Sequence, residues 1–292
     1  MALLPFRVTG SFLILLMSLS FWGCSTKAYI VKSMDPIMDD MNASVNRNID
    51  VDMVRDAMPA FLVQMDGLIV SAPDSRLRVR AAEAYFGYAF AFVEDTDRPR
   101  ASLIYLKARD YALDTLRSYR RFDRSCGGQL PEFKDALTDF RKQDVPAIYW
   151  AANNWLAWAA LNLDKPETLM DIPKVEALLK RSIELDETYY YGAAHASLGA
   201  FYAAQPRMIG GSPEKAREHF DKAFALSSDR LLFIHLMYAK FYAYQIQDRD
   251  LFVKTLEKVV ATPAGSFPDR AFANEVAKRK AKILLDKVDE NF

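Results

Sequence analysis

A run of small residues on one predicted helix limits what this chain can fold into more than any other feature. Between residues 193 and 203, alanine or glycine recurs among aromatic residues, at Ala193, Ala196, Gly199, Ala200 and Ala203. A helix face this small allows a second helix to approach closely. The next residues supply that helix, because Ser212-Pro213-Glu214 is typical of a helix start. The stretch 189–227 therefore predicts a tightly packed helical hairpin.

This hairpin follows the pattern of a tetratricopeptide repeat. The positions that match the pattern are Leu198, Gly199 and Tyr202 in the first helix, and Ala216, Phe220 and Ala223 in the second. The connection from Ala204 to Gly211 is about five residues longer than a 34-residue repeat allows. The unit to look for elsewhere is therefore a helical pair with an enlarged loop.

Similar patterns recur along the chain and predict an all-α fold. The predicted pairs cover residues 75–121, 146–187, 189–228 and 230–261, and a polar helix over 268–287 would cap the stack. We expect about four tetratricopeptide-like helical hairpins with flanking helices at both ends, forming one domain over residues 24–292. The chain has 11 Gly and 13 Pro, few for the many turns of a β-sandwich.

Two local features modify this picture. A helix is predicted over Val51 to Val70, and Pro59 is expected to divide or kink it. Residues 122–145 interrupt the repeat period. Insertions in a repeat array often lie on a binding face, so this segment is a candidate for one.

The N-terminus resembles a bacterial lipoprotein signal. Arg7 precedes an uncharged run from Val8 to Trp22, which is too short to span a bilayer as a helix. Gly23-Cys24-Ser25 then resembles a lipobox, in which the cysteine is lipidated and becomes the first mature residue. We expect residues 1–23 to be a signal peptide and Cys24 to carry the lipid. The alternative is an ordinary core cysteine behind an uncleaved anchor.

Charge and motifs argue against several kinds of function. The 38 basic and 38 acidic side chains balance, so nothing favours a nucleic-acid partner. The histidines His195, His219 and His235 lie in three separate predicted elements without metal-ligand spacing, and no nucleotide-binding or nucleophile-elbow motif occurs. We therefore predict a protein that is not an enzyme and has no catalytic residues, metal or cofactor. Cys126 is expected to be an unreactive thiol.

Aromatic residues gather in the predicted first helices and just before them. The candidates for lining a groove, a pore or a subunit contact are Trp155, Trp158, Tyr189, Tyr190, Tyr191, Tyr202, Tyr242 and Tyr244. Core packing explains most aromatic residues on helices when each is taken alone. Three consecutive tyrosines cannot all face one core, however, because neighbours on a helix point about 100° apart.

Several blocks of the sequence resemble one family. The matching blocks are AEAYFGYAFAFVED, YLKARDYALDTL, IYWAANNWLAWAALNLDKP and the run from KVEALLKRSIELD to YAKFYAYQIQDRDLF. They are similar to the T-component (TatT) family of TRAP transporter accessory lipoproteins, from about Ala82 to Phe252, with Cys24 at the lipobox position. The strongest part is PRMIGGSPEKAREHF, which a generic tetratricopeptide repeat would not have.

The resemblance implies a specific role. Members of this family are all-helical periplasmic lipoproteins with cryptic tetratricopeptide pairs, which assemble as homotrimers with a pore through each protomer. The resemblance implies a partner, the periplasmic substrate-binding P-component, and a hydrophobic or organic-acid ligand. It implies attachment to a membrane, the outer membrane being expected, through lipidated Cys24. The alternative is an envelope scaffold lipoprotein that grips a peptide or assembly partner in the same groove.

The lipid anchor can be tested directly. Changing Cys24 to Ala removes the only thiol at the lipobox position, so the variant should move from the membrane fraction to the soluble fraction. Fractionation and immunoblotting of cells that make either form would measure this. Unchanged membrane association of Cys24→Ala would refute lipidation at this position.

Overall fold

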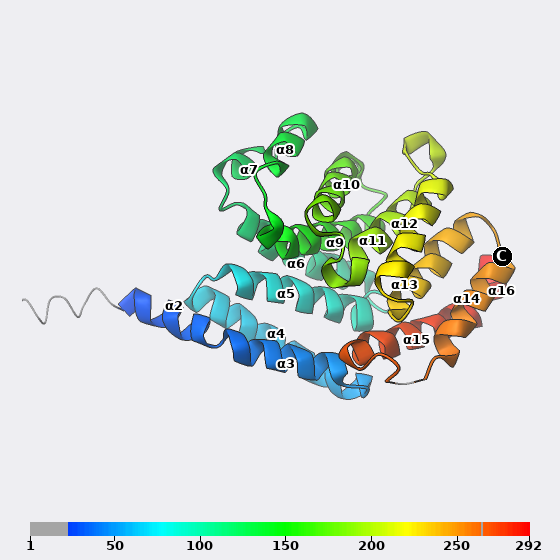
Figure 1. Ribbon diagram of the computed structural model, residues 1–292, viewed down its shortest axis with the longest axis horizontal. Coiled ribbons are helices and arrows are strands. Elements are labelled where there is room, and N and C mark those ends of the chain that lie inside the picture. Colours follow the sequence, from blue (N-terminus) through cyan, green and yellow to red (C-terminus); the bar gives the residue numbers. More distant parts are fainter. Residues whose placement is uncertain (1–22, 264) are drawn as a thin grey trace, which may run out of the picture.

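The computed structural model describes residues 23–263 and 265–292, and every regular element in those ranges is helical (Figure 1). The predicted all-α fold of helical hairpins is confirmed. The helices of the first half are α2 (Gly23–Ser33), α3 (Asp35–Arg47), α4 (Val51–Ser71), α5 (Ser75–Tyr88), α6 (Arg98–Leu116), α7 (Arg120–Ser125) and α8 (Leu130–Leu137). Those of the second half are α9 (Val145–Leu161), α10 (Pro166–Asp186), α11 (Ala193–Ala204), α12 (Pro213–Leu226), α13 (Leu232–Met237), α14 (Arg249–Ala261), α15 (Ala271–Asp286) and α16 (Val288–Asn291).

Short helices of other types join these elements. Two π-helices, η2 (Ala89–Val93) and η6 (Tyr238–Ala243), directly extend α5 and α13. Four 3₁₀ turns precede longer helices: η3 (Lys142–Asp144), η4 (Tyr189–Gly192), η5 (Arg207–Ile209) and η7 (Pro268–Arg270). The π segments matter for the site, because π-bulges often occur where a helix takes part in function.

Local side-chain caps explain where several helices begin. Asp74 accepts a hydrogen bond from Leu77 N at 3.0 Å and so caps α5. Ser212 accepts one from Lys215 N at 3.2 Å, which confirms the predicted start of α12. Each such cap satisfies an amide that the helix itself cannot pair. Pro59 was expected to divide or kink its helix. It does not divide it, because α4 runs from Val51 to Ser71 with Pro59 inside.

Small residues lie where the paired helices meet. The helices pack as α5 on α6, α9 on α10, α11 on α12, and α13 with η6 on α14. At the α11–α12 contact, a methyl group on Gly199 would lie 2.7 Å from Phe220 Cδ2. Phe220 is fully buried there. The close approach of the two helices therefore requires glycine at this position.

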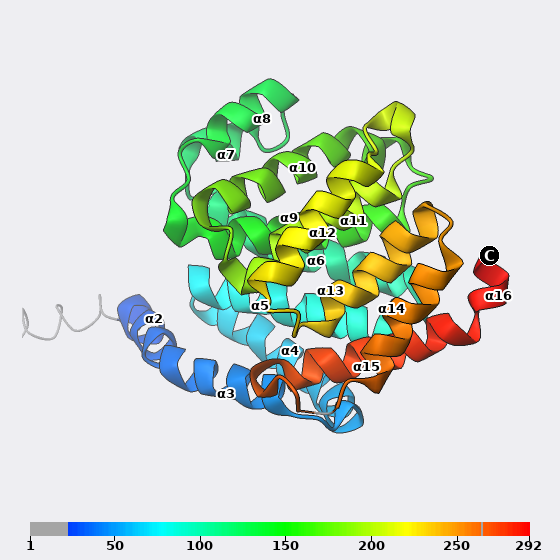
Figure 2. The ribbon, with the colours of Figure 1, turned by 45° about the vertical axis from the view of Figure 1, so that its right-hand side comes forward.

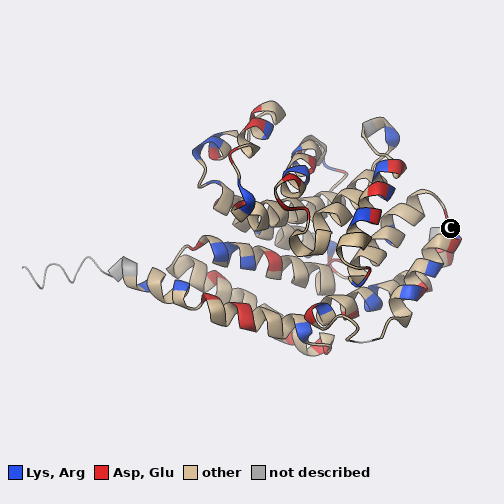
Figure 3. Ribbon diagram, in the orientation of Figure 1, with Lys and Arg blue, Asp and Glu red and all other residues tan. Residues whose placement is uncertain are grey.

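Helices α9 and α11 form the uncharged centre of the molecule. Neither contains Lys, Arg, Asp or Glu, and both are tan along their length in Figure 3. Every residue from 193 to 203 is buried. In α9, the fully buried Asn154 donates hydrogen bonds to Ala82 O at 3.2 Å and Trp150 O at 2.8 Å, which ties α9 to α5.

Helix α15, near the C-terminus, packs against helices from the start of the described chain. It lies beside α3 in both views of the ribbon and also contacts α4 (Figures 1 and 2). Phe272 of α15 packs against Phe92, with ring centroids 6.2 Å apart. Asn274 accepts a hydrogen bond from Leu232 N at 2.9 Å and so takes the place of an N-cap for α13. Instead of only capping a stack, α15 closes the superhelix on the N-terminal hairpin of α3 and α4.

Ion pairs add to this closure. Arg47 pairs with Asp269 at 2.8 Å, and Arg279 pairs with Asp52 at 2.9 Å. Both pairs are exposed to solvent, so each contributes little to stability. Lys280 is mostly buried and contacts Glu94 at 3.1 Å. The apolar packing of α15 therefore provides most of the stabilisation of the closed form.

The helix contact at Gly199 can be tested with a matched pair of variants. Gly199→Ala should destabilise the protein by about 1 to 3 kcal/mol, because the added methyl group forces α11 and α12 apart. Gly67→Ala is the control, since an added Cβ there meets nothing within 4 Å. It should be neutral or stabilise by up to about 1 kcal/mol. Urea unfolding measures both, and equal stabilities would contradict the close contact.

Candidate functional site

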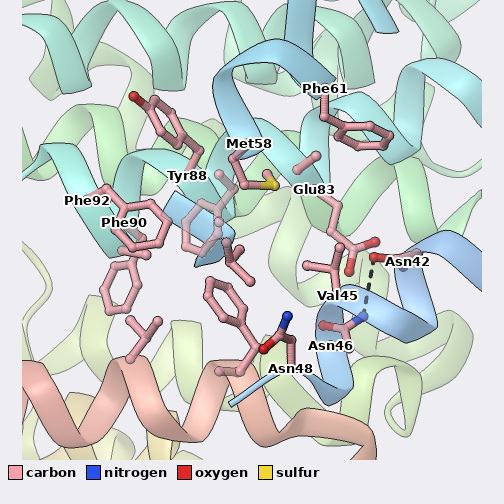
Figure 4. A pocket seen from close by; sticks show the side chains of 18 of the residues that line it. Asn42, Val45, Asn46, Asn48, Met58, Phe61, Glu83, Tyr88, Phe90 and Phe92 are labelled. Carbon is pink, nitrogen blue, oxygen red and sulfur yellow. Dashed lines mark hydrogen bonds between the residues drawn. The ribbon is translucent and has the colours of Figure 1, made fainter. Parts of the chain in front are cut away.

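An apolar cavity of about 450 Å³ lies where α3, α4, α5, η2 and α15 meet (Figure 4). This volume is in the range that small-molecule sites in proteins occupy. Its aromatic lining consists of Phe61, Phe86, Tyr88, Phe90, Phe92, Tyr149, Trp150, Tyr190, Phe233 and Phe272. Met41, Met53 and Met58 add flexible side chains from the N-terminal hairpin. The lining therefore suits an apolar ligand.

The π-helix η2 gives the cavity part of its shape. It follows α5 without a break and places Phe90 and Phe92 in the wall. Phe90 meets Phe233 edge-on, with centroids 5.2 Å apart. Because Phe90 comes from the first hairpin and Phe233 from the last, the wall depends on closure of the whole superhelix.

A second, more polar cavity of about 660 Å³ adjoins the first. It is lined mainly by α3, α5 and the segment just before α9, including Gln143 and Asp144. At its edge, Arg80 pairs with Asp35 and with Asp39, the latter at 2.8 Å. Asn42 and Glu83 line both cavities. These two side chains therefore mark the junction between an apolar chamber and a polar opening.

Glu83 is the charged group at this junction. Its side chain extends from α5 toward Asn42 and Asn46 of α3 (Figure 4). Burial raises the pKa of the Glu83 carboxyl, and the positive charge of Arg270 and the hydroxyl of Tyr190 oppose part of that rise. A carboxyl held this way can accept hydrogen bonds from a polar group that enters the cavity.

Arg270 contacts the ring and the hydroxyl of Tyr190. Its Cζ lies 4.2 Å from the centre of the Tyr190 ring, and its Nη1 donates a hydrogen bond of 3.1 Å to the Tyr190 hydroxyl. The guanidinium thus holds the ring by both a cation–π contact and a hydrogen bond. Tyr190 lines the cavity, whereas Arg270 is not among its lining residues.

The consecutive tyrosines lie in a left-handed turn rather than on a helix. Tyr190 has φ 50° and Tyr191 has φ 60°, and Gly192 follows with φ 76°. Bulky residues rarely adopt this conformation, and such strain is often kept at functional sites. The turn directs Tyr190 onto Trp150, with centroids 5.2 Å apart. The assumption of helical geometry for residues 189–191 was therefore wrong.

The predicted aromatic residues are distributed unequally around the cavities. Tyr190 lines the apolar cavity and Tyr189 lines the polar one. Tyr191 packs edge-on against Phe267, and Tyr244 is exposed. Four others are buried and are not among the lining residues of either cavity: Trp155, Trp158, Tyr202 and Tyr242.

Sequence reasoning missed most of the cavity wall. Phe86, Phe90 and Phe92 line it but are not among the predicted aromatic residues, and the parts of α3, α4 and α15 that line the cavity gave no local signal. Glu83 did carry one. It is the only charged residue between Ala81 and Val93, in a segment otherwise made of alanine, glycine and aromatic or branched residues. A lone acid in such a helix is a candidate for a buried site.

The histidines form two separate contacts. His195 and His219 face each other with their Nδ1 atoms 2.9 Å apart, and burial lowers the pKa of His219 to about 4. His235 contacts Asp229 at 2.8 Å. No group of three or more potential metal ligands occurs in the part of the chain that the structure describes. Cys126 is buried, and burial raises the pKa of its thiol.

Residues 1–22 of the predicted signal peptide lie outside the part of the chain that the structure describes. The backbone of α2 begins at Gly23, one residue before Cys24. Among the helices that are described, none is both long and apolar enough to cross a membrane.

The fold and cavity define an all-helical protein with an aromatic-lined cavity between its helices. Comparison with known families matches residues 47–292 to the TRAP transporter T-component family. The chain belongs to this family, whose members are periplasmic accessory components of TRAP transporters. An uncharacterized protein of Treponema pallidum (strain Nichols) is 26% identical over 260 residues, covering 83% of this chain and 80% of the relative.

The raised pKa of Glu83 predicts a difference in pH dependence. A carboxyl whose pKa is higher in the folded than in the unfolded protein binds its proton more tightly in the folded state. The free energy of unfolding therefore falls as the pH rises above about 4.5, the ordinary pKa of a glutamate. Glu83→Gln cannot ionise. Its free energy of unfolding relative to wild type should therefore increase from about pH 4.5 to pH 8.

Urea unfolding at several pH values measures this difference. The exposed Glu132→Gln is the matched control for removal of a surface carboxyl. If the Glu83→Gln difference is flat, the carboxyl is not buried as described.

Proposed function

We propose that this chain is a non-enzymatic, periplasmic accessory protein of a TRAP-type transporter. Lipidated Cys24 attaches it to a membrane, the outer membrane being our expectation, and the protein binds the substrate-binding P-component as a homotrimer. It holds a small hydrophobic or organic-acid ligand in the apolar cavity and exchanges it through the polar cavity. The observation that carries this proposal is the aromatic cavity that meets a polar opening at Asn42 and Glu83.

Family membership supports the transporter role, and the cavity supports ligand binding. The cavity has an apolar wall with few polar groups at one end, which is typical of sites for small molecules. Its lining includes one carboxyl and no histidine, lysine or arginine. That set favours holding a ligand over acid–base chemistry, which needs paired groups.

A peptide groove receives less support. In a tetratricopeptide array the first helices line an open concave surface. Here every residue of α11 from 193 to 203 is buried, and α15 closes the superhelix. An enclosed small ligand therefore fits this inner surface better than an extended peptide.

The proposal predicts two separable activities. A pull-down with the native lipoprotein from its own envelope should recover a periplasmic solute-binding protein. The purified chain should also bind the neutral fluorescent probe N-phenyl-1-naphthylamine. Gly87→Leu should weaken probe binding at least tenfold, because Gly87 lines the cavity and an added side chain there would occupy it. Partner recovery should be unchanged.

Gly67→Leu is the matched control, since Gly67 is exposed and is not a lining residue of the cavity. It should bind the probe as wild type does. Failure to recover any solute-binding protein would contradict the transporter role. An affinity for the probe that Gly87→Leu leaves unchanged would contradict the ligand site.

A further inference from the structure

We propose that the apolar cavity selects its ligand by the polar end group. It takes an apolar molecule whose polar end donates hydrogen bonds, such as a hydroxyl, amide or ammonium group, to the carboxylate of Glu83, and it discriminates against a molecule of the same size that ends in a carboxylate. This inference rests on the ligand-binding role proposed above and narrows the class of ligand.

The charge distribution around the cavity is the first argument. Among the residues that line it, Glu83 is the one Asp, Glu, Lys, Arg or His side chain. It lies at the end where the apolar cavity meets the polar one. Ser44 and the amides of Asn42, Asn46 and Asn48 also line the cavity, but they are neutral, so Glu83 gives this end its negative charge. A ligand that fills the apolar wall therefore places its polar end beside a negatively charged acceptor.

The position of Arg270 is the second argument. Its guanidinium lies 4.2 Å from the centre of the Tyr190 ring and donates to the Tyr190 hydroxyl at 3.1 Å. Tyr190 lines the cavity, whereas Arg270, held against that ring, is not a lining residue. Arg270 and Arg80 both favour the ionised form of Glu83 against the effect of burial, and Arg80 is itself paired with Asp35 and Asp39.

The chemistry of the end group is the third argument. A carboxylate only accepts hydrogen bonds, so it cannot pair with the Glu83 carboxylate. Like charges in a partly buried site also repel more strongly than in water. A hydroxyl or an ammonium group can donate instead, and a hydrogen bond to a charged group is stronger than one between neutral groups. Hydrogen-bond donation and charge repulsion therefore both disfavour a ligand that ends in a carboxylate.

Three probes with the same chain test this directly: 1-decanol, decylammonium and decanoate. Their binding to the full chain with Cys24→Ser, purified without detergent, is measured by isothermal titration calorimetry at about pH 7.5. We expect 1-decanol and decylammonium to bind at least tenfold more tightly than decanoate. In Glu83→Gln, decanoate should bind at least fivefold more tightly than to wild type, and decylammonium should bind at least fivefold more weakly.

Controls show that the probes occupy the cavity and that the variant is folded. Glu132→Gln should leave all three affinities unchanged, and Gly87→Leu should weaken all three. Circular dichroism and the urea midpoint show whether Glu83→Gln keeps the fold. If it does not, wild-type binding of 1-methoxynonane, an isomer of 1-decanol that only accepts hydrogen bonds, replaces it. This ether should bind at least fivefold more weakly than 1-decanol, and equal affinities would overturn the selection.

The outcomes separate this inference from the function on which it rests. Tight decanoate binding that Glu83→Gln does not change would overturn the selection and leave the cavity as a ligand site, with Arg270 reaching the anion. Failure of all three probes to bind would overturn both the selection and the ligand role. Recovery of the solute-binding partner would still test the transporter role separately.

Discussion

The close packing of helices through small residues is the constraint on which the rest of this structure depends. Gly199 lies directly against Phe220, and the alanines at the other helix contacts are fully buried, among them Ala81, Ala108 and Ala151. Contacts of this kind bring helix axes close together. They allow α9 and α11 to form an uncharged centre, around which the outer helices curve until α15 meets α3 and α4.

Closure of the superhelix creates the cavity. Its wall combines Phe90 from the first hairpin, Phe233 from the last and Phe272 from α15, so no single hairpin contains it. The strained turn at Tyr190 and the π-helix η2 both lie on this wall. Backbone strain of this kind persists where surrounding packing determines it. The same closure leaves Glu83 at the one polar end of an otherwise apolar chamber.

How much of this could be predicted from the sequence depends on the range of each interaction. The start of α12 at Ser212 is set within four residues, so a local pattern predicted it. The closure links Asp52 to Arg279, which are 227 residues apart, and no local pattern contains such a contact. The tyrosine turn was missed because the argument assumed helical geometry, whereas the backbone adopts positive φ at Tyr190 and Tyr191. Glu83 was visible in the sequence as a lone acid, but its partners were not.

The central claim is that the closed superhelix encloses a chamber which a ligand can enter. A crystal structure of the full chain soaked with 1-bromodecane tests it most directly, because bromine can be located by its anomalous scattering. We expect a bromine peak inside the chamber, within van der Waals contact of Phe86, Phe92 or Phe272. Bromine peaks confined to the outer surface, with side chains filling the chamber, would contradict it.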